Sequence, residues 1–296
     1  MSFKYKECYE AAEAGDLEEL KRLHEAGCNW GVGTPTYAAS NGHLECLKYL
    51  YENGCQWDWQ TPVNAARNGH LECLKYAHEN GGEWDSNTTM CAAANGHLNC
   101  LRYAHENGCE WDIWSPAYAA ENGHLECLKY AFENGCPGNW KTPAYAALNG
   151  YIECLKYAHE NGYPWGYASP MFASRNGNLE CLKYAHENGC PWNWQAPKEA
   201  AKNGYLECFK YCFERWDDPQ KFWKYDYDLS KIQDKIDLDD LVWRRLFTMD
   251  LSKHPNLQEK VESKKKEIEK LKEASKEVLE SILPMDIIQY CLHSLI

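Results

Sequence analysis

The sequence predicts an all-α solenoid of eight 27-residue units, followed by a helical C-terminal segment. The dipeptide Asn-Gly recurs every 27 residues, and Gly15 keeps the same phase. A fixed period of this length is the signature of a stacked repeat array. The dipeptides begin at Asn41, Asn68, Asn95, Asn122, Asn149, Asn176 and Asn203. We therefore expect a repeat array at residues 1–214 and a helical extension or cap at residues 215–296.

Each unit is predicted to hold two helices, as the unit from Thr61 to Asn87 illustrates. Thr61 is expected to cap a short first helix, with Pro62 at its first position, where the missing N–H has no cost. Asn68-Gly69 ends that helix, because both residues tolerate a positive φ. A second helix is predicted at residues 70–79, and another Asn-Gly pair ends it as a C-cap.

The second helix is predicted to lie between neighbouring units, because apolar residues cover more than half of its circumference. A lone amphipathic helix needs only a narrower stripe. Glu72 and Lys75 lie three residues apart on the remaining face and can form an ion pair. One unit cannot bury its own core, whereas a stack can. The apolar residues are Leu71, Cys73, Leu74, Tyr76 and Ala77.

The ends of the array differ from its middle. In the first unit Glu19 stands where later units have Cys, and Arg22 stands where they have Tyr. An N-terminal cap needs such a polar outer face. The last unit has no closing Asn-Gly pair, and the composition changes after Glu214.

The units resemble the ankyrin repeat over about residues 7–214, through Thr/Ser-Pro, Ala-Ala, Asn-Gly-His-Leu-Glu and a final Glu-Asn-Gly. The usual ankyrin unit has about 33 residues, and its Thr-Pro-Leu-His signature is broken here, because Ala117-Tyr118 follows the Pro. The resemblance implies a helix-turn-helix stack in which the projecting β-hairpins are reduced or absent. Such short units, rich in Cys and Trp, are similar to ankyrin expansions in large DNA viruses, algae and protists.

Charge and composition exclude two classes of partner. The net charge is −13, whereas a nucleic-acid binder needs a basic face and an anionic membrane repels an acidic protein. The sequence has no apolar run of membrane-spanning length and no signal-peptide pattern at its start. We therefore expect a cytoplasmic protein whose 16 cysteines are reduced.

The recurring histidines and cysteines do not predict a metal or catalytic site. His43 and Cys46 lie three residues apart on one helical face, which is the spacing of half a zinc site. In three later units Tyr151, Asn178 and Tyr205 replace the His while the Cys stays. We interpret these cysteines as small buried apolar residues. We expect no metal, no cofactor and no enzymatic activity, because the sequence has no nucleophile–base pair and no phosphate-binding loop.

Two sets of aromatic residues follow the turns between units. A Trp stands two residues beyond most turns, and we interpret this regular set as packing that replaces the missing hairpin. Gly138 alone interrupts it. The regular set is Trp30, Trp57, Trp84, Trp111, Trp165 and Trp192. A second, irregular set is Trp59, Trp114, Trp140, Tyr167 and Trp194.

The resemblance implies that the loops and first helices line the binding face. Residues there differ from unit to unit, as expected of positions that contact a partner, although relaxed surface drift is the alternative. Exposed aromatic residues and Arg are typical of interface hot spots. The candidate partner-binding residues are Tyr37, Trp59, Arg67, Trp114, Tyr118, Glu121, Trp140, Tyr145, Tyr167, Phe172, Arg175 and Trp194.

Function is therefore predicted to be protein–protein interaction. The segment from Arg215 has 15 basic and 17 acidic residues, so the repeats carry −11 of the net charge and favour a partner with a basic patch.

The C-terminal extension suggests an alternative function. Helices are predicted at 238–251 and 255–283, and the segment that follows resembles the opening of an F-box. That resemblance implies docking to the linker subunit of a cullin–RING ubiquitin ligase, with the repeats choosing the substrate. An apolar helix that seals the end of the array explains the same residues. The candidate docking residues are Leu283, Pro284, Ile287 and Ile288.

Overall fold

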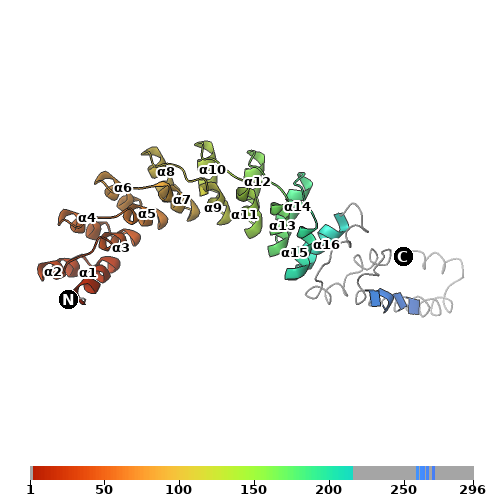
Figure 1. Ribbon diagram of the computed structural model, residues 1–296, viewed down its shortest axis with the longest axis horizontal. Helices are drawn as coiled ribbons and strands as arrows, with labels where there is room; N and C mark the ends of the chain where they lie inside the picture. The colour runs from red at the N-terminus through yellow and green to blue at the C-terminus, as the bar shows by residue number, and fades with distance from the viewer. Residues whose placement is uncertain (1–2, 216–257, 260, 264, 267–268, 271–296) are drawn as a thin grey trace, which may run out of the picture. The chain divides into compact units, whose positions relative to one another are not determined.

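The computed structural model describes residues 3–215, together with residues 258–259, 261–263, 265–266 and 269–270. Between residues 3 and 215 every regular element is a helix, so the predicted all-α class is confirmed and no β-hairpin occurs in that range. In chain order (Figure 1) the helices are α1 (Phe3–Ala14), α2 (Leu17–Glu25), α3 (Thr34–Ser40), α4 (Leu44–Glu52), α5 (Gln60–Arg67), α6 (Leu71–Glu79), α7 (Ser86–Ala94), α8 (Leu98–Glu106), α9 (Ser115–Glu121), α10 (Leu125–Glu133), α11 (Lys141–Asn149), α12 (Ile152–Glu160), α13 (Ala168–Asn176), α14 (Leu179–Glu187), α15 (Gln195–Asn203) and α16 (Leu206–Arg215).

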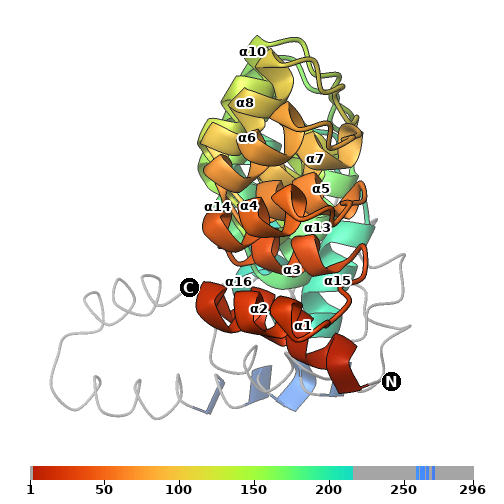
Figure 2. The same ribbon diagram turned by 90° about the vertical axis from the view of Figure 1, so that its left-hand side faces the viewer.

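The helices of residues 3–200 lie in two rows (Figure 2). The odd row consists of α1, α3, α5, α7, α9, α11 and α13, and consecutive helices of this row pack against each other. The even row consists of α2 to α14, and each of its helices packs against the odd-numbered helix of its own unit. Helices of the even row contact one another less extensively. This arrangement is the stack of helix pairs that the period predicts.

Residues 1–200 and residues 201–296 form two compact units. In the second unit, α16 buries an apolar surface that includes Phe209 and Phe213. Between residues 258 and 270 the described residues are helical, and Val261 is buried there. The helix predicted at 238–251 and the candidate docking residues Leu283, Pro284, Ile287 and Ile288 lie outside the described residues.

The first helix of a unit begins earlier than predicted. Helix α5 starts at Gln60, whose backbone N–H donates to the carboxylate of Asp58 at 3.0 Å. Thr61, the expected cap, therefore lies inside the first turn and is fully buried. Its Oγ1 is 3.0 Å from Oγ1 of Thr36 on the preceding odd helix. The cap prediction is wrong because the N-cap residue is Trp59, and Thr61 packs between units.

The first Asn-Gly turn is fixed by two requirements that meet at its glycine. Gly69 has φ +79°, whereas Asn68 keeps a negative φ of −102°. A Cβ at Gly69 would also lie 2.5 Å from Nδ1 of His97 in the next unit. The sharp turn and the contact between units therefore both require glycine at this position.

The predicted sandwich of the second helix is confirmed. In α6, Cys73, Leu74 and Ala77 are buried, and Leu74 is entirely inaccessible to solvent. On the exposed side Lys75 Nζ lies 2.8 Å from a carboxylate oxygen of Glu72, as the spacing predicts.

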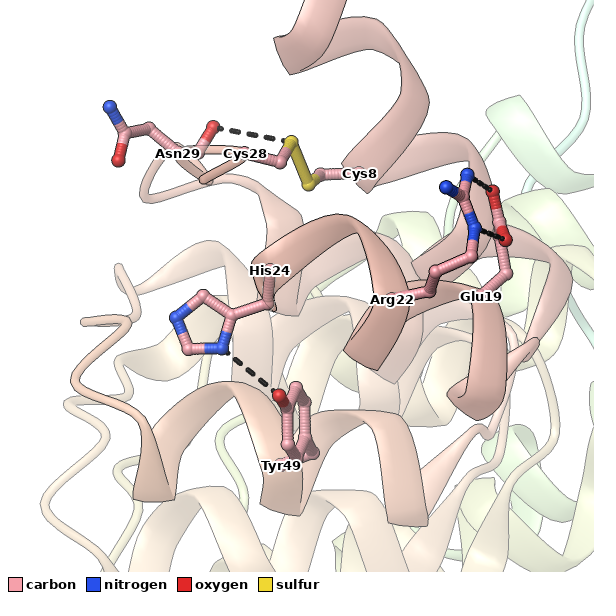
Figure 3. Close-up of a disulfide and its surroundings, with 7 residues drawn as sticks. All are labelled: Cys8, Glu19, Arg22, His24, Cys28, Asn29 and Tyr49. Carbon is pink, nitrogen blue, oxygen red and sulfur yellow. Dashed lines mark hydrogen bonds and ion pairs between the residues drawn. A yellow bond between two sulfur atoms is a disulfide. The ribbon is translucent and has the colours of Figure 1, made fainter. Parts of the chain in front are cut away.

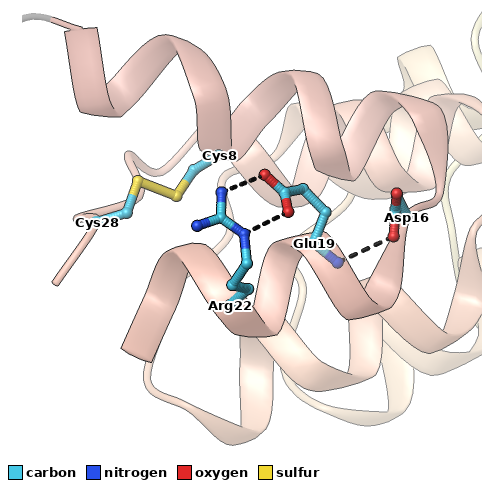
Figure 4. A network of polar contacts seen from close by, with 5 residues as sticks. All are labelled: Cys8, Asp16, Glu19, Arg22 and Cys28. Atoms are coloured by element: carbon cyan, nitrogen blue, oxygen red, sulfur yellow. Dashed lines mark hydrogen bonds and ion pairs between the residues drawn. A yellow bond between two sulfur atoms is a disulfide. The ribbon is translucent and has the colours of Figure 1, made fainter. Parts of the chain in front are cut away.

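The first unit presents the polar outer face that a cap needs (Figure 4). Arg22 Nε and Nη2 each donate to one carboxylate oxygen of Glu19 at 2.6 Å. The Arg22 hydrogen bond lowers the pKa of the Glu19 carboxyl group. Asp16 caps α2 by accepting a hydrogen bond from the backbone N–H of Glu19 at 2.9 Å. The predicted polar outer face of the first unit, which caps the array at its N-terminal end, is therefore confirmed.

The expectation that every thiol is reduced is wrong for one pair, because Cys8 and Cys28 form a disulfide (Figure 3). Cys8 stands at the position that Pro35 occupies in the second unit. That position lies beside the turn cysteine of its own unit, as Thr89 lies beside Cys109. Only the first unit has cysteines at both positions. The other cysteines of residues 3–215 are buried.

Candidate partner-binding surface

The regular Trp set packs between units, as predicted. Trp84 stacks on His78 of its own unit with ring centroids 3.6 Å apart. It also meets the edge of Tyr103 from the next unit at 6.1 Å. The same His–Trp pairing is present at Trp30, Trp111, Trp165 and Trp192. These rings make contacts within the chain, so little of their surface remains for a partner.

The gap in this set is filled by a second departure from the repeat. Gly138 stands where other units have Trp, and the ring of Tyr163 occupies the space beside it. Tyr163 itself replaces a turn cysteine and packs against Phe132 with centroids 5.5 Å apart. Tyr163 is buried, and burial raises the pKa of its hydroxyl. The two substitutions therefore compensate each other within one interface.

The irregular aromatic set is more regular than the sequence suggested. Trp59, Trp140, Tyr167 and Trp194 share one position of the 27-residue unit, just before the odd-row helix. Val32 and Ile113 occupy the same position, and sequence reasoning missed both, although counting in steps of 27 finds them. The exposed fractions of the five residues other than Trp194 lie between 49% and 62%. We call the set the apolar ladder; its members are Val32, Trp59, Ile113, Trp140, Tyr167 and Trp194.

The other predicted site residues lie in or beside the odd-row helices. Tyr37, Tyr118, Tyr145 and Phe172 share one position along these helices, and the three last-named are half-buried. Arg67, Glu121 and Arg175 share a position three residues further on, on the same helical face. Trp114 lies one residue after Ile113 of the ladder and is half-buried. None of the twelve predicted residues is buried, so the odd row can present all of them.

Several of these side chains touch across unit boundaries. Tyr37 stacks on Tyr9 of the first unit with ring centroids 5.0 Å apart. Arg67 donates from Nη2 to Sγ of Cys91 at 3.4 Å. The predicted residues therefore form a surface that runs along the odd row instead of converging on one pocket.

Charge is distributed unequally between the two rows. The six odd helices α3–α13 carry three cationic residues and one carboxylate, a net charge of +2. The six even helices α4–α14 carry six cationic residues and eleven carboxylates, a net charge of −5 with His neutral. The acidity of the repeats thus lies largely outside the odd-row helices.

The His–Cys pairs are arranged for packing. His43 places Nε2 3.0 Å from the carbonyl oxygen of Glu13 in the preceding unit. Burial raises the pKa of Cys46 to about 11 and that of Cys73 to about 12. Such thiols are protonated at neutral pH and are poor nucleophiles and metal ligands. Over the described ranges, the His, Cys, Asp and Glu side chains form no group that could hold a metal ion.

No helix in the part of the chain that the structure describes is long and apolar enough to cross a membrane.

Comparison with known proteins agrees with this architecture. The family model described as "Ankyrin repeats (3 copies)" matches residues 8–88, 63–141 and 89–167, which together span more than half of the chain. No curated protein matches the sequence. Among solved structures, the crystal structure of the human ASB11 ankyrin repeat domain is similar, with 22% identity and a TM-score of 0.45. The match covers 53% of this chain and 84% of that one.

Proposed function

This chain belongs to the ankyrin-repeat family, and from that premise we propose that it is a scaffold that binds another protein along its odd row. Ankyrin repeats are in general protein–protein interaction domains, and the fold is typically a non-catalytic scaffold. In this proposal the array at residues 1–214 is the binding part, and residues 215–296 are its helical extension or cap. We place its activity in the cytoplasm.

The apolar ladder is the observation that carries this proposal. Each member lies at a loop–helix junction, and Trp59, Trp140 and Tyr167 are about half exposed. Trp and Tyr rings dominate interface energetics, because each buries roughly 150–250 Å² when covered. The rings of the regular Trp set, such as Trp84, are instead packed against His and Tyr side chains of the chain itself. The ladder rings are therefore available to a partner.

Net charge adds an expectation about encounter. The repeats carry −11, so a partner with a basic patch is attracted at long range. The carboxylates responsible lie mainly on the even helices. Steering of this kind changes the association rate and its salt dependence more than the final contacts.

Affinity purification of the full chain with mass spectrometry tests the proposal. The variant Trp59→Ser/Trp140→Ser/Tyr167→Ser is expected to lose partners that the wild type retains. A matched control removes two other exposed rings, with Tyr51→His and Phe132→His, because five other units have His at that position. The control is expected to retain those partners. Equal retention by both variants, with unchanged circular dichroism, contradicts binding through the ladder.

The alternative function, a substrate receptor of a cullin–RING ubiquitin ligase, rests on the sequence at residues 283–288. The variant Leu283→Ala/Pro284→Ala/Ile287→Ala/Ile288→Ala is expected to lose ligase subunits that the wild type retains. Absence of those subunits from the wild-type purification contradicts this function and leaves the scaffold proposal intact.

A further inference from the structure

We propose that the odd row between α9 and α13 binds an acidic segment of the partner protein. In this arrangement a partner carboxylate pairs with Lys141, and an adjacent apolar side chain covers Trp114 and Trp140. The inference rests on the proposed scaffold function and adds the chemistry of its partner. That chemistry is opposite to what the net charge of the repeats suggests.

Lys141 lies beside three aromatic rings, and among the described residues it forms no ion pair. Its Nζ lies 4.2 Å from the ring centroid of Trp114 and 5.9 Å from that of Trp140. The centroid of Tyr145 is 5.7 Å away. Lys141 is half-buried, and a charge that is partly shielded from solvent attracts a counter-ion more strongly than one in open water.

The lysines of the even row provide the contrast. Lys48, Lys75, Lys129 and Lys156 each lie 2.7–2.9 Å from the carboxylate of the Glu three residues before them. Their charge is therefore neutralised within one helix. Gly138 stands three residues before Lys141, so no carboxylate occupies the corresponding place.

The carboxylates that surround this part of the odd row do not occupy Lys141. Asp112 is engaged with its own turn, where Oδ1 accepts from the Trp114 backbone N–H at 2.7 Å and Oδ2 accepts from Ser86 Oγ at 3.4 Å. Glu121 lies at the far end of α9. Glu199 is paired with Arg175 at 3.9 Å. An additional carboxylate supplied by a partner would meet Lys141 without displacing an existing ion pair.

Helix geometry favours an anion at the same place. Lys141 is the first residue of the nine-residue helix α11, where the helix dipole is positive and a cation is unfavourable. A partner carboxylate beside Lys141 would relieve that repulsion. The same preference extends to α13, because α11 and α13 hold Lys141 and Arg175 without a carboxylate, and the loops before them, residues 134–140 and 161–167, hold none either. Charge complementarity thus selects an acidic segment with an apolar residue beside its carboxylate.

Selection of random peptides on the immobilised full chain tests the inference. Peptides of about 12 residues are long enough to cross three units when extended. The peptides retained by the wild type are expected to be enriched in Asp and Glu next to aromatic or aliphatic residues. Enrichment in Lys and Arg, or no charge preference, overturns the inference.

Two variants of equal charge change locate the effect. Lys141→Glu is expected to bind the best acidic peptide roughly tenfold more weakly in a fluorescence polarisation assay, while Lys141→Arg stays close to the wild type. Lys129→Glu alters the net charge of the chain equally but lies on the even row, and its affinity is expected to stay within about twofold, because its distance from the site permits screening. Equal weakening by Lys141→Glu and Lys129→Glu means that only net charge matters and overturns the inference.

The variant Trp140→Ser separates this inference from the scaffold proposal. If selected peptides depend on Trp140 but show no acidic preference, the ladder binds proteins and the partner chemistry is wrong. If the selected peptides are indifferent to Trp59, Trp140 and Tyr167, both the ladder and the inference built on it are wrong.

Discussion

The even and odd rows of the stack use the same kinds of side chain in opposite ways. On the even row, lysines pair with glutamates of their own helix, and the regular Trp rings stack on His and Tyr. On the odd row, Lys141 lies beside the rings of Trp114, Trp140 and Tyr145, and the ladder rings extend into solvent. The charged and aromatic side chains of the even row are therefore engaged in contacts within the chain. Capacity for binding remains where the chain leaves its own groups uncovered.

Substitutions in the interface around Tyr163 are expected to change the free energy of unfolding most, because its rings are fully engaged between units. Gly138→Trp forces a ring into the space of Tyr163, and Tyr163→Cys leaves a cavity. Each substitution alone is expected to lower the free energy of unfolding by about 2–3 kcal/mol. The double variant restores the residues found in other units and is expected to recover most of the loss. Urea denaturation of the four proteins measures the coupling.

Additive losses in that cycle would mean that the two positions do not share one packing space. Gly138 and Tyr163 would then not compensate each other in the packing between units.

The turn glycines provide the second test. Gly69→Ala must adopt a positive φ and also displace His97, whereas Gly54→Ala meets the same backbone requirement with no heavy atom within 4 Å. The expected loss in the free energy of unfolding is about 2 kcal/mol at Gly69 and about 1 kcal/mol at Gly54. The difference between the two urea midpoints isolates the contact between units. Equal losses would show that only the backbone conformation requires glycine.

Trp84 and Trp140 compare the two rows directly. Trp84→Ala removes a ring stacked on His78 and set against Tyr103, so we expect a loss of about 1.5 kcal/mol in the free energy of unfolding. Trp140→Ala removes a ring that is 49% exposed, and its cost is expected to stay within about 0.5 kcal/mol. Thermal and urea denaturation measure both. A larger loss for Trp140→Ala than for Trp84→Ala would mean that the ladder rings, and not the regular Trp set, stabilise the fold.

The fold could be predicted from the sequence because the same local patterns recur in the eight units. Asn-Gly, the wide apolar helix and the Glu–Lys spacing each have a local cause, and all three appear in the structure. The start of the first helix was mispredicted, because Thr61 suits a cap by residue type, whereas its burial against Thr36 of the preceding unit depends on the stack. Cys8 was not paired in advance, since its neighbour in space is 20 residues away.

The candidate surface was only half predictable. The aromatic residues stood out by type, whereas Val32 and Ile113 are visible only in register, and their exposure depends on the stack. The charge of the surface could not be predicted from composition. Net charge sums helices and loops together, whereas the helices of the two rows have opposite signs.

The smallest effect is expected from the histidines that join units. Burial lowers the pKa of His97 and His124, so the fold favours their neutral forms. Their stabilising contribution is complete above the unfolded pKa of about 6.5, and it declines as the pH falls from there through the folded pKa values. Asn178 is the natural replacement at this position and donates to the Ala147 carbonyl at 3.0 Å.

The variant His97→Asn/His124→Asn is therefore expected to keep the contact between units and lose its titration. Urea midpoints measured from about pH 7.5 to about pH 5 should fall more for the wild type than for this variant, because only the wild type has to keep both rings neutral as the pH falls. Identical slopes would mean that protonation leaves these contacts intact. The histidine contacts between units would then be equally strong at neutral and at acid pH. Only the Trp and Lys contacts would then distinguish the even row from the odd row.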